Sequence, residues 1–249
     1  MKSDGSKPPA RMTAEAVDPS QCIAIFSHRE SEADTDPDSE FWSGIRSLFA
    51  DCDTHGQVVP NHKTEIRVRW TFSNLYFLFI CPYLELNLKP DPNTSSETNE
   101  LWNWDVAEVF VGADFKNTSR YREFEVSPQG EWVDLDINLD LEHPEDGWVW
   151  RSGCQTAARI DSTRKIWYGF IRVPYSAIDQ RPAAPGNVLR INFYRSQGPE
   201  SNRKEIAWRA THATTFHTAE SFGEVVLGDS KDDLAETANL PGLEIQDLD

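Results

Sequence analysis

The 249-residue sequence lacks a long hydrophobic run. Its longest apolar segment, residues 75–81, ends at Pro82, whereas a membrane-spanning helix needs roughly 20 apolar residues. The first 20 residues are polar and contain no apolar core of the kind found in signal peptides. We therefore expect no membrane association. We expect a cytoplasmic location for the chain as written, and an extracytoplasmic one if a leader has been removed.

Positive charge is also scarce, because 24 Lys+Arg stand against 41 Asp+Glu and give a net charge of −17. Nucleic acids and anionic lipid surfaces both attract basic proteins, so neither is an expected partner. The four cysteines include no CxxC pair, which removes the usual zinc and thioredoxin patterns. We expect free and mostly buried thiols, while disulfides stay open for an exported protein.

Common catalytic and cofactor signatures are missing. No serine or cysteine lies in a nucleophile-elbow motif, and there is no Walker, Rossmann or HExxH pattern. His212 and His217 lie five residues apart, and a surface or packing role is favoured over a metal site. The two methionines, Met1 and Met12, lie in the polar leader, which disfavours a Met/His haem site.

The sequence does contain repeated two-residue alternation of apolar and polar side chains, which is typical of half-buried strands. In residues 64–72, for example, Ile66, Val68, Trp70 and Phe72 are predicted to share one face. Strands are predicted at residues 64–72, 75–81, 106–111, 121–127, 133–137, 154–160, 166–173, 188–195 and 223–227. Short helical turns are expected at 174–178 and near Phe41. The fold class is therefore all-β: one antiparallel β-sandwich domain, jelly-roll or immunoglobulin-like.

Three regions follow from this pattern. Residues 1–20 are predicted to be a disordered leader, residues 21–229 the β-sandwich domain, and residues 230–249 an acidic flexible tail. The tail holds six acidic residues against one lysine.

The segment 101–110, Leu-Trp-Asn-Trp-Asp-Val-Ala-Glu-Val-Phe, resembles the signature of family 9 carbohydrate-binding modules, which belong to the DOMON-like clan. Segments 69–77, 121–128 and 208–223 resemble further parts of that family in the same order. The resemblance spans roughly residues 20–229. It implies a sandwich that binds sugars without cleaving them, and it associates the chain with carbohydrate catabolism.

By this resemblance, Trp102 and Phe216 are the two walls of an aromatic clamp, and Glu108 accepts sugar hydroxyls. Glu125 and Ser127 stand where the family pattern has Arg and Asn, and they are candidate ligand-binding residues. No cofactor is required. Calcium sites occur in the family, so the resemblance leaves calcium open, but it does not match their ligands to this sequence residue by residue.

The residues themselves fit this chemistry. Aromatic rings cover the C–H face of a sugar, and carboxylates accept its hydroxyls. Trp102 and Trp104 would share a face if extended, so Trp104 is a second candidate wall, and packing in the core is the alternative for both. Glu108 is either a ligand contact or a member of an ion pair.

Two other sets of residues leave alternatives open. Asp134 and Asp136 would lie about 7 Å apart on one strand face, within the range for an inverting glycosidase, but a solvated face is favoured. Arg195 either reaches a ligand or closes a buried ion pair.

The leading hypothesis is non-catalytic binding of a mono- or oligosaccharide by a monomer. A glycoside hydrolase, or an accessory protein of one, is the first alternative. A DOMON-type haem or interaction module is the second.

Overall fold

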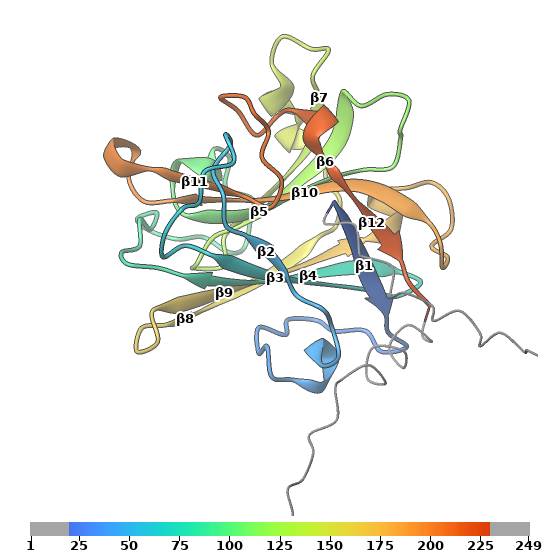
Figure 1. The fold of residues 1–249 in the computed structure, drawn as a ribbon, viewed down its shortest axis with the longest axis horizontal. Helices are drawn as coiled ribbons and strands as arrows, with labels where there is room; N and C mark the ends of the chain where they lie inside the picture. Colours follow the sequence, from blue (N-terminus) through green and yellow to red (C-terminus); the bar gives the residue numbers. More distant parts are fainter. Residues whose placement is uncertain (1–19, 230–249) are drawn as a thin grey trace, which may run out of the picture.

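Two stacked β-sheets form the protein in a computed structural model that describes residues 20–229 (Figure 1). The first sheet has the order β7-β6-β5-β10-β12-β1, with β11 on the other part of β10. Its strands are β7 (Trp132–Asn138), β6 (Arg120–Val126), β5 (Val106–Gly112), β10 (Val188–Gln197), β11 (Lys204–Ala207), β12 (Gly223–Leu227) and β1 (Gln21–Phe26).

The second sheet continues from β1 in the order β3-β4-β9-β8, and β2 pairs with the outer side of β3. Its strands are β2 (Leu48–Ala50), β3 (Thr64–Trp70), β4 (Asn74–Pro82), β9 (Ile166–Pro174) and β8 (Gln155–Asp161). Strand β1 belongs to both sheets, because its first half pairs with β12 and its end pairs with β3. Both of these pairings are parallel, whereas the other strand pairings are antiparallel.

The main core lies between the two sheets. Side chains at alternate positions of β5 and β6, such as Val109 and Phe124, point into it and meet Phe77 and Trp167 of the second sheet. These side chains are fully buried, and burial of apolar area is the main stabilising term in folding.

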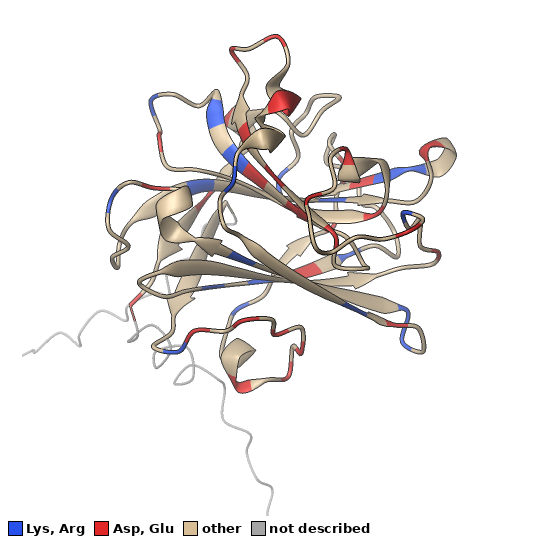
Figure 2. Cartoon of the chain, turned by 180° about the vertical axis from the view of Figure 1, so that it is seen from behind, with Lys and Arg blue, Asp and Glu red and all other residues tan. Residues whose placement is uncertain are grey.

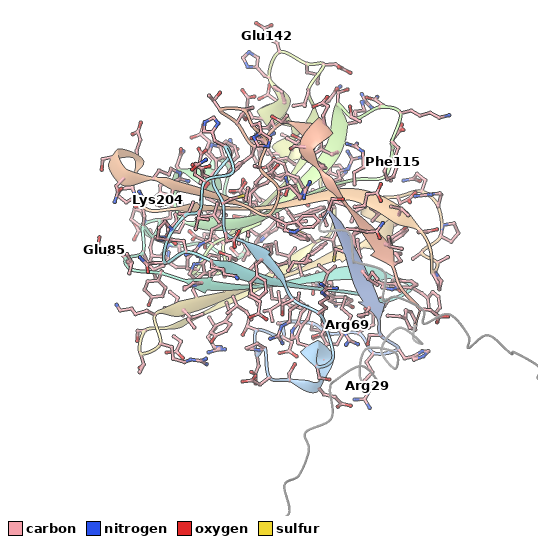
Figure 3. All side chains as sticks on the ribbon, in the orientation of Figure 1. Arg29, Arg69, Glu85, Phe115, Glu142 and Lys204 are labelled. Atoms are coloured by element: carbon pink, nitrogen blue, oxygen red, sulfur yellow. The ribbon has the colours of Figure 1, made fainter. Side chains whose placement is uncertain are left out.

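A second apolar cluster covers the opposite face of the first sheet. It includes Phe110, Tyr121, Leu135, Ile137 and Tyr194, which alternate with the core-facing residues of the same strands. A loop carrying Glu142 and the chain between β11 and β12 rise above this face (Figure 3). The first sheet is thus buried on both faces at its β5–β6–β7 end.

Several short 3₁₀ helices connect the strands: η1 (Glu40–Trp42), η2 (Leu101–Asn103), η3 (Pro144–Val149), η4 (Tyr175–Ala177), η5 (Glu200–Asn202) and η6 (Ala219–Ser221). Trp42 of η1 is buried against Tyr76, Leu78 and Phe170 on the outer face of the second sheet. Within residues 20–229, no helix has the length and apolar character needed to cross a membrane.

The predicted all-β sandwich with short helical turns is confirmed. Strands lie at each of the nine predicted positions, while β1, β2 and β11 were not predicted. Phe72 does not share the buried face of Ile66 and Trp70, because β3 ends at Trp70 and Phe72 is 66% exposed. The four cysteines are free, and three of them are buried. The predicted leader and tail lie outside the described residues, apart from residue 20.

Acidic and basic residues intermingle over the loops and strands (Figure 2). In this view, the acidic residues of the described chain do not gather on one side with the basic residues on another. Function has to be sought in a particular site.

Candidate functional site

A pocket of about 430 Å³ lies on the outer face of the first sheet. Its lining comes from β5, β6, β7, β10 and β11 and from three segments above them. The residues are Trp102, Glu108, Phe110, Glu123, Leu135, Ile137, Leu139, Pro144, Glu145, Ser196, Arg203, Glu205, Thr214, Thr215, Phe216 and His217. Its volume falls in the range of small-molecule sites.

Trp102 forms one wall of this pocket. It lies at the centre of η2, which follows a left-handed residue, Glu100, with φ 58°. The guanidinium of Arg203 fixes this turn by donating to the carbonyls of Trp102 and Trp104, the second at 3.0 Å. The Trp102 ring is therefore presented by a turn whose backbone is anchored to the chain beside β11.

Phe216 forms another part of the wall. Its ring stacks on Tyr194 with 4.2 Å between centroids and 16° between planes. The Tyr194 hydroxyl also donates to the Phe216 carbonyl at 3.1 Å. The ring and the backbone of Phe216 are thus both held by one residue of β10, which supports a loop-borne aromatic on a rigid strand.

Three glutamates, Glu108, Glu123 and Glu125, form an acidic cluster at the floor. Glu108 and Glu125 are direct partners across β5 and β6, and Glu123 lies two residues from Glu125 on the same strand face. One carboxylate oxygen from each lies within 4.8 Å of those of the other two, and the residues are 2%, 3% and 0% exposed. Glu108 accepts a hydrogen bond from Ser196 at 3.2 Å. No hydrogen bond from a described residue reaches either Glu125 oxygen or Glu123 Oε2.

This crowding changes the acidity of the cluster. Burial, followed by the charge of Glu123, raises the pKa of Glu108 to about 8. Burial also raises the pKa of Glu125, and the negative charges of Glu108 and Glu123 raise it further. The pKa of Glu123 is raised by burial as well. Three adjacent buried carboxyl groups therefore resist being ionised together without a partner, and a bound proton or a bound cation stabilises them.

His217 closes one side of the pocket. Its Nδ1 lies 2.6 Å from the Tyr121 hydroxyl, and its ring lies 5.2 Å from that of Phe110. The sequence favoured a surface or packing role, and the side chain is exposed but shapes the pocket. His212 is also exposed and does not line the pocket.

Of the predicted ligand-binding residues, Trp102, Phe216 and Glu108 line the pocket, and Glu125 lies behind them in the acidic cluster. Trp104 does not line it and does not share a face with Trp102, because Trp102 is in a helical turn rather than an extended segment. The Trp104 ring instead lies 5.9 Å from Lys89 Nζ.

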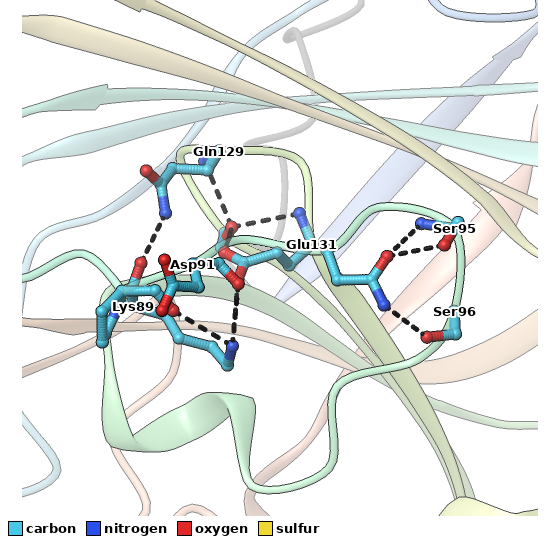
Figure 4. Close-up of polar contacts among 9 residues, drawn as sticks. Lys89, Asp91, Ser95, Ser96, Gln129 and Glu131 are labelled. Atoms are coloured by element: carbon cyan, nitrogen blue, oxygen red, sulfur yellow. Dashed lines mark hydrogen bonds and ion pairs between the residues drawn. The ribbon is translucent and has the colours of Figure 1, made fainter.

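Ser127 also lies outside the pocket and organises the turn between β6 and β7. Its hydroxyl donates to Glu131 at 2.8 Å and accepts from the backbone N–H groups of Gln129 and Glu131. Gln129 then donates to the Lys89 carbonyl at 2.9 Å, and Lys89 Nζ lies 3.9 Å from Glu131 (Figure 4). The contacts of Ser127 within the protein are therefore those of a turn residue.

The favoured interpretation of Asp134 and Asp136 as a solvated face is wrong for Asp134. Asp134 is fully buried and accepts hydrogen bonds from the N–H and hydroxyl of Ser152, whereas the side chain of Asp136 is 43% exposed and pairs with Arg122. Both alternate along β7 with Leu135 and Ile137, so they point away from the pocket.

Arg195 lies on the core-facing side of β10 and is fully buried. It donates to Thr64 at 3.2 Å and to Gln197, and its guanidinium lies 5.8 Å from the Trp167 ring. It does not line the pocket, so it neither reaches a ligand there nor forms one of the ion pairs found among the described residues.

Sequence reasoning missed Glu123, Arg203 and Ser196 as pocket residues. Glu123 could have been found, because it is two residues before Glu125 and shares its strand face. Arg203 and Ser196 depend on the pairing of β10 with β5 and β11, which a single sequence does not reveal.

The calcium sites expected from the family resemblance can be compared with these residues. In residues 20–229, the acidic cluster is the one group of three or more His, Cys, Asp or Glu side chains close enough to share a metal ion. Its donors are all carboxylate oxygens, which suit a hard cation such as calcium. The cluster therefore fits the chemistry of that ion.

The fold and the pocket together define a class: a β-sandwich with an aromatic- and carboxylate-lined pocket on one sheet. The model of the carbohydrate family 9 binding domain-like family matches residues 34–230, and the chain belongs to that family.

One relative is similar to part of the chain in sequence. A protein from Arthroderma benhamiae named "Extracellular protein" is 23% identical over 141 residues, a match that covers 52% of this chain and 63% of that relative. The chain therefore spans less than two thirds of that relative's length.

Solved structures support the fold. A family 9 module from Caldicellulosiruptor kristjanssonii in complex with cellotriose has a TM-score of 0.60 at 12% identity, covering 90% of this chain and 99% of that one. Its glucose complex has a TM-score of 0.61 at 12% identity, covering 84% and 96%. A Bacteroides uniformis protein reaches 0.65 at 14% identity, covering 83% and 98%.

Proposed function

We propose that the pocket binds a mono- or oligosaccharide and does not cleave it. The observation that carries this proposal is the combination of aromatic walls with a carboxylate floor in a pocket of about 430 Å³. The rings of Trp102 and Phe216 offer apolar surface to the C–H face of a sugar. Glu108 and the other polar groups of the pocket offer partners to its hydroxyls.

Glucose and short glucose oligomers are the first ligands to test, because the related module from Caldicellulosiruptor kristjanssonii was solved with glucose and with cellotriose. The pocket opens on one face and is closed at its floor by β5 and β6. A terminal sugar entering with its ring against Trp102 would bring its hydroxyls toward Glu108 and Ser196.

The non-catalytic part of the proposal is supported by the position of the carboxylates that spacing suggested as a hydrolytic pair. Asp134 and Asp136 lie on the other face of β7 and are engaged by Ser152 and Arg122. A glycosidase would need its acid and base on the two sides of the scissile bond.

Isothermal titration calorimetry with glucose and cellotriose tests the proposal. Trp102→Ala should reduce the affinity by about tenfold or more, since it removes a large apolar contact. Trp104→Ala is the matched control, because Trp104 follows the same turn but lies outside the pocket lining, and its affinity should match that of the wild type.

Two results would contradict the proposal. One is the absence of binding heat with a broad panel of neutral sugars. The other is an increase in reducing ends from an oligosaccharide that Glu108→Gln abolishes, because this would make the pocket catalytic.

A further inference from the structure

The acidic cluster of Glu108, Glu123 and Glu125 gathers three buried carboxyls that receive few hydrogen bonds from the donors of the protein. Glu125 is fully buried, and neither of its oxygens receives a hydrogen bond from a described residue. Glu123 is 3% exposed, and its Oε2 also receives no hydrogen bond from a described residue. Buried carboxylates without a partner are costly, so native proteins rarely keep several together without a purpose.

The charge of Arg203 lowers the pKa values of Glu108 and Glu125, but it does not offset burial and the neighbouring carboxyls. Among the pocket-lining residues, Arg203 is the one permanently charged cation. Its two terminal nitrogens donate to backbone carbonyls of η2 and to that of Gly198, the latter at 3.1 Å. Glu145 and Glu205 at the rim add negative charge. The pocket therefore presents an excess of carboxylates to whatever enters it.

We propose that Glu108, Glu123 and Glu125 form a binding site for a hard divalent cation, with calcium as the best fit, at the floor of the pocket. One oxygen of each residue lies within 4.8 Å of the others, which is about twice a typical calcium–oxygen distance. All donors are oxygens, and carboxylates on two neighbouring strands of one sheet supply them. A monovalent ammonium group would leave more of the negative charge uncompensated.

The pocket also gives the ion a way to meet a ligand. Glu108 and Glu123 line the pocket, whereas Glu125 lies behind them, so the open side of the cluster faces the cavity between Trp102 and Phe216. Sugar hydroxyls would then complete the coordination of the ion. This second part of the inference rests on the proposed function, whereas the cation site does not.

Terbium luminescence measures the site without any sugar. Tb³⁺ replaces Ca²⁺ at oxygen sites, and the Trp102 ring in the same pocket can sensitise its emission. Protein first treated with a chelator should show sensitised emission that added Ca²⁺ displaces. Glu125→Gln should weaken Tb³⁺ binding by at least about tenfold, because affinity follows the number of charged ligands.

The choice of variants guards against misfolding and non-specific attraction. Glu125→Gln keeps the side-chain volume and removes one ionisable group from the buried cluster, so the variant should fold and have an equal or higher midpoint of thermal unfolding without calcium. Calcium should raise that midpoint for the wild type and have little effect on the variant. Glu32→Gln, which changes an exposed carboxylate outside the pocket lining, should bind Tb³⁺ within about twofold of the wild type.

The outcomes separate the two proposals. Equal Tb³⁺ affinity of the wild type and Glu125→Gln, or no sensitised emission at all, overturns the cation site. If Tb³⁺ binds as expected but chelator leaves sugar binding unchanged, only the proposed contact between the ion and the sugar is contradicted. If Tb³⁺ binds as expected but no sugar binds, the proposed function is contradicted and the cation site is supported.

Discussion

The two faces of the first sheet use the same strands for opposite chemistry. On β6, Phe124 points into the core between the sheets, while its neighbours Glu123 and Glu125 point to the outer face. On β5, Val109 and Glu108 divide in the same way. All five are at most 3% exposed, so burial alone does not distinguish a side chain of the core from one of the pocket or the acidic cluster.

Hydrogen bonding separates Asp134 from Glu125, which burial does not. Asp134 on the inner face of β7 is fully buried too, and its Oδ1 receives no hydrogen bond from a described residue, but its Oδ2 receives the N–H of Ser152 at 2.9 Å and the hydroxyl of the same residue. Glu125 on the outer face receives none from a described residue. A buried carboxylate that the protein leaves without donors, beside a pocket, indicates a partner from outside.

The largest effect should come from breaking the inner face. Phe124→Ala removes a fully buried ring and should lower the free energy of unfolding by about 3–5 kcal/mol, measured by chemical denaturation. Glu123→Gln, one residue away on the outer face, should leave stability equal or higher in a chelating buffer at pH 8. Equal losses in both variants would show that the two faces do the same structural work.

A smaller effect should come from loosening the Trp102 wall. Lys cannot reproduce the set of carbonyl contacts that Arg203 makes with η2, so Arg203→Lys should weaken sugar binding by about fivefold. The control is Arg159→Lys on β8 of the second sheet, which should bind sugar as the wild type does. Calorimetry measures both, and an unchanged affinity for Arg203→Lys would contradict the anchoring role.

The third effect depends on pH and concerns a carboxyl near the inner face. Burial, followed by Asp134, raises the pKa of Glu97 to about 8 in the folded protein, above its ordinary value of 4.5. The folded state therefore holds the proton more tightly, and this group lowers stability as pH rises from about 4.5 to 8. Glu97→Gln removes that titration but can still accept the N–H of Asp134.

The difference in unfolding free energy between Glu97→Gln and the wild type should thus grow in favour of the variant from pH 5 to pH 8. Denaturation at several pH values measures it. A constant difference would mean that Glu97 titrates normally in the folded protein.

Much of the fold was readable from local patterns, because half-buried strands such as β3 and β6 alternate with period two. Strand β1 was not predicted because five of its six residues are apolar or cysteine, which leaves no alternation. It also pairs in parallel with strands that are distant in the sequence. Strands β2 and β11 have only three and four residues, which is too short for a periodic signal.

The site was readable only in part. The motif around Trp102 and Glu108, together with Phe216, predicted residues that the structure brings into one pocket, although binding by them stays a prediction. The prediction that Trp102 and Trp104 share a face depended on an extended segment, and a 3₁₀ turn at Leu101–Asn103 takes its place. The acidic cluster depends on the register between β5 and β6, and that register is a long-range property.

The central claim is that the buried carboxylates of the outer face serve binding rather than folding. Glu108→Gln tests it most directly when its free energy of unfolding and its affinity for glucose or cellotriose are measured on the same preparation. We predict that the variant is at least as stable as the wild type in a chelating buffer at pH 8 and binds sugar at least about tenfold more weakly. A variant that loses stability while keeping its sugar affinity would contradict the account.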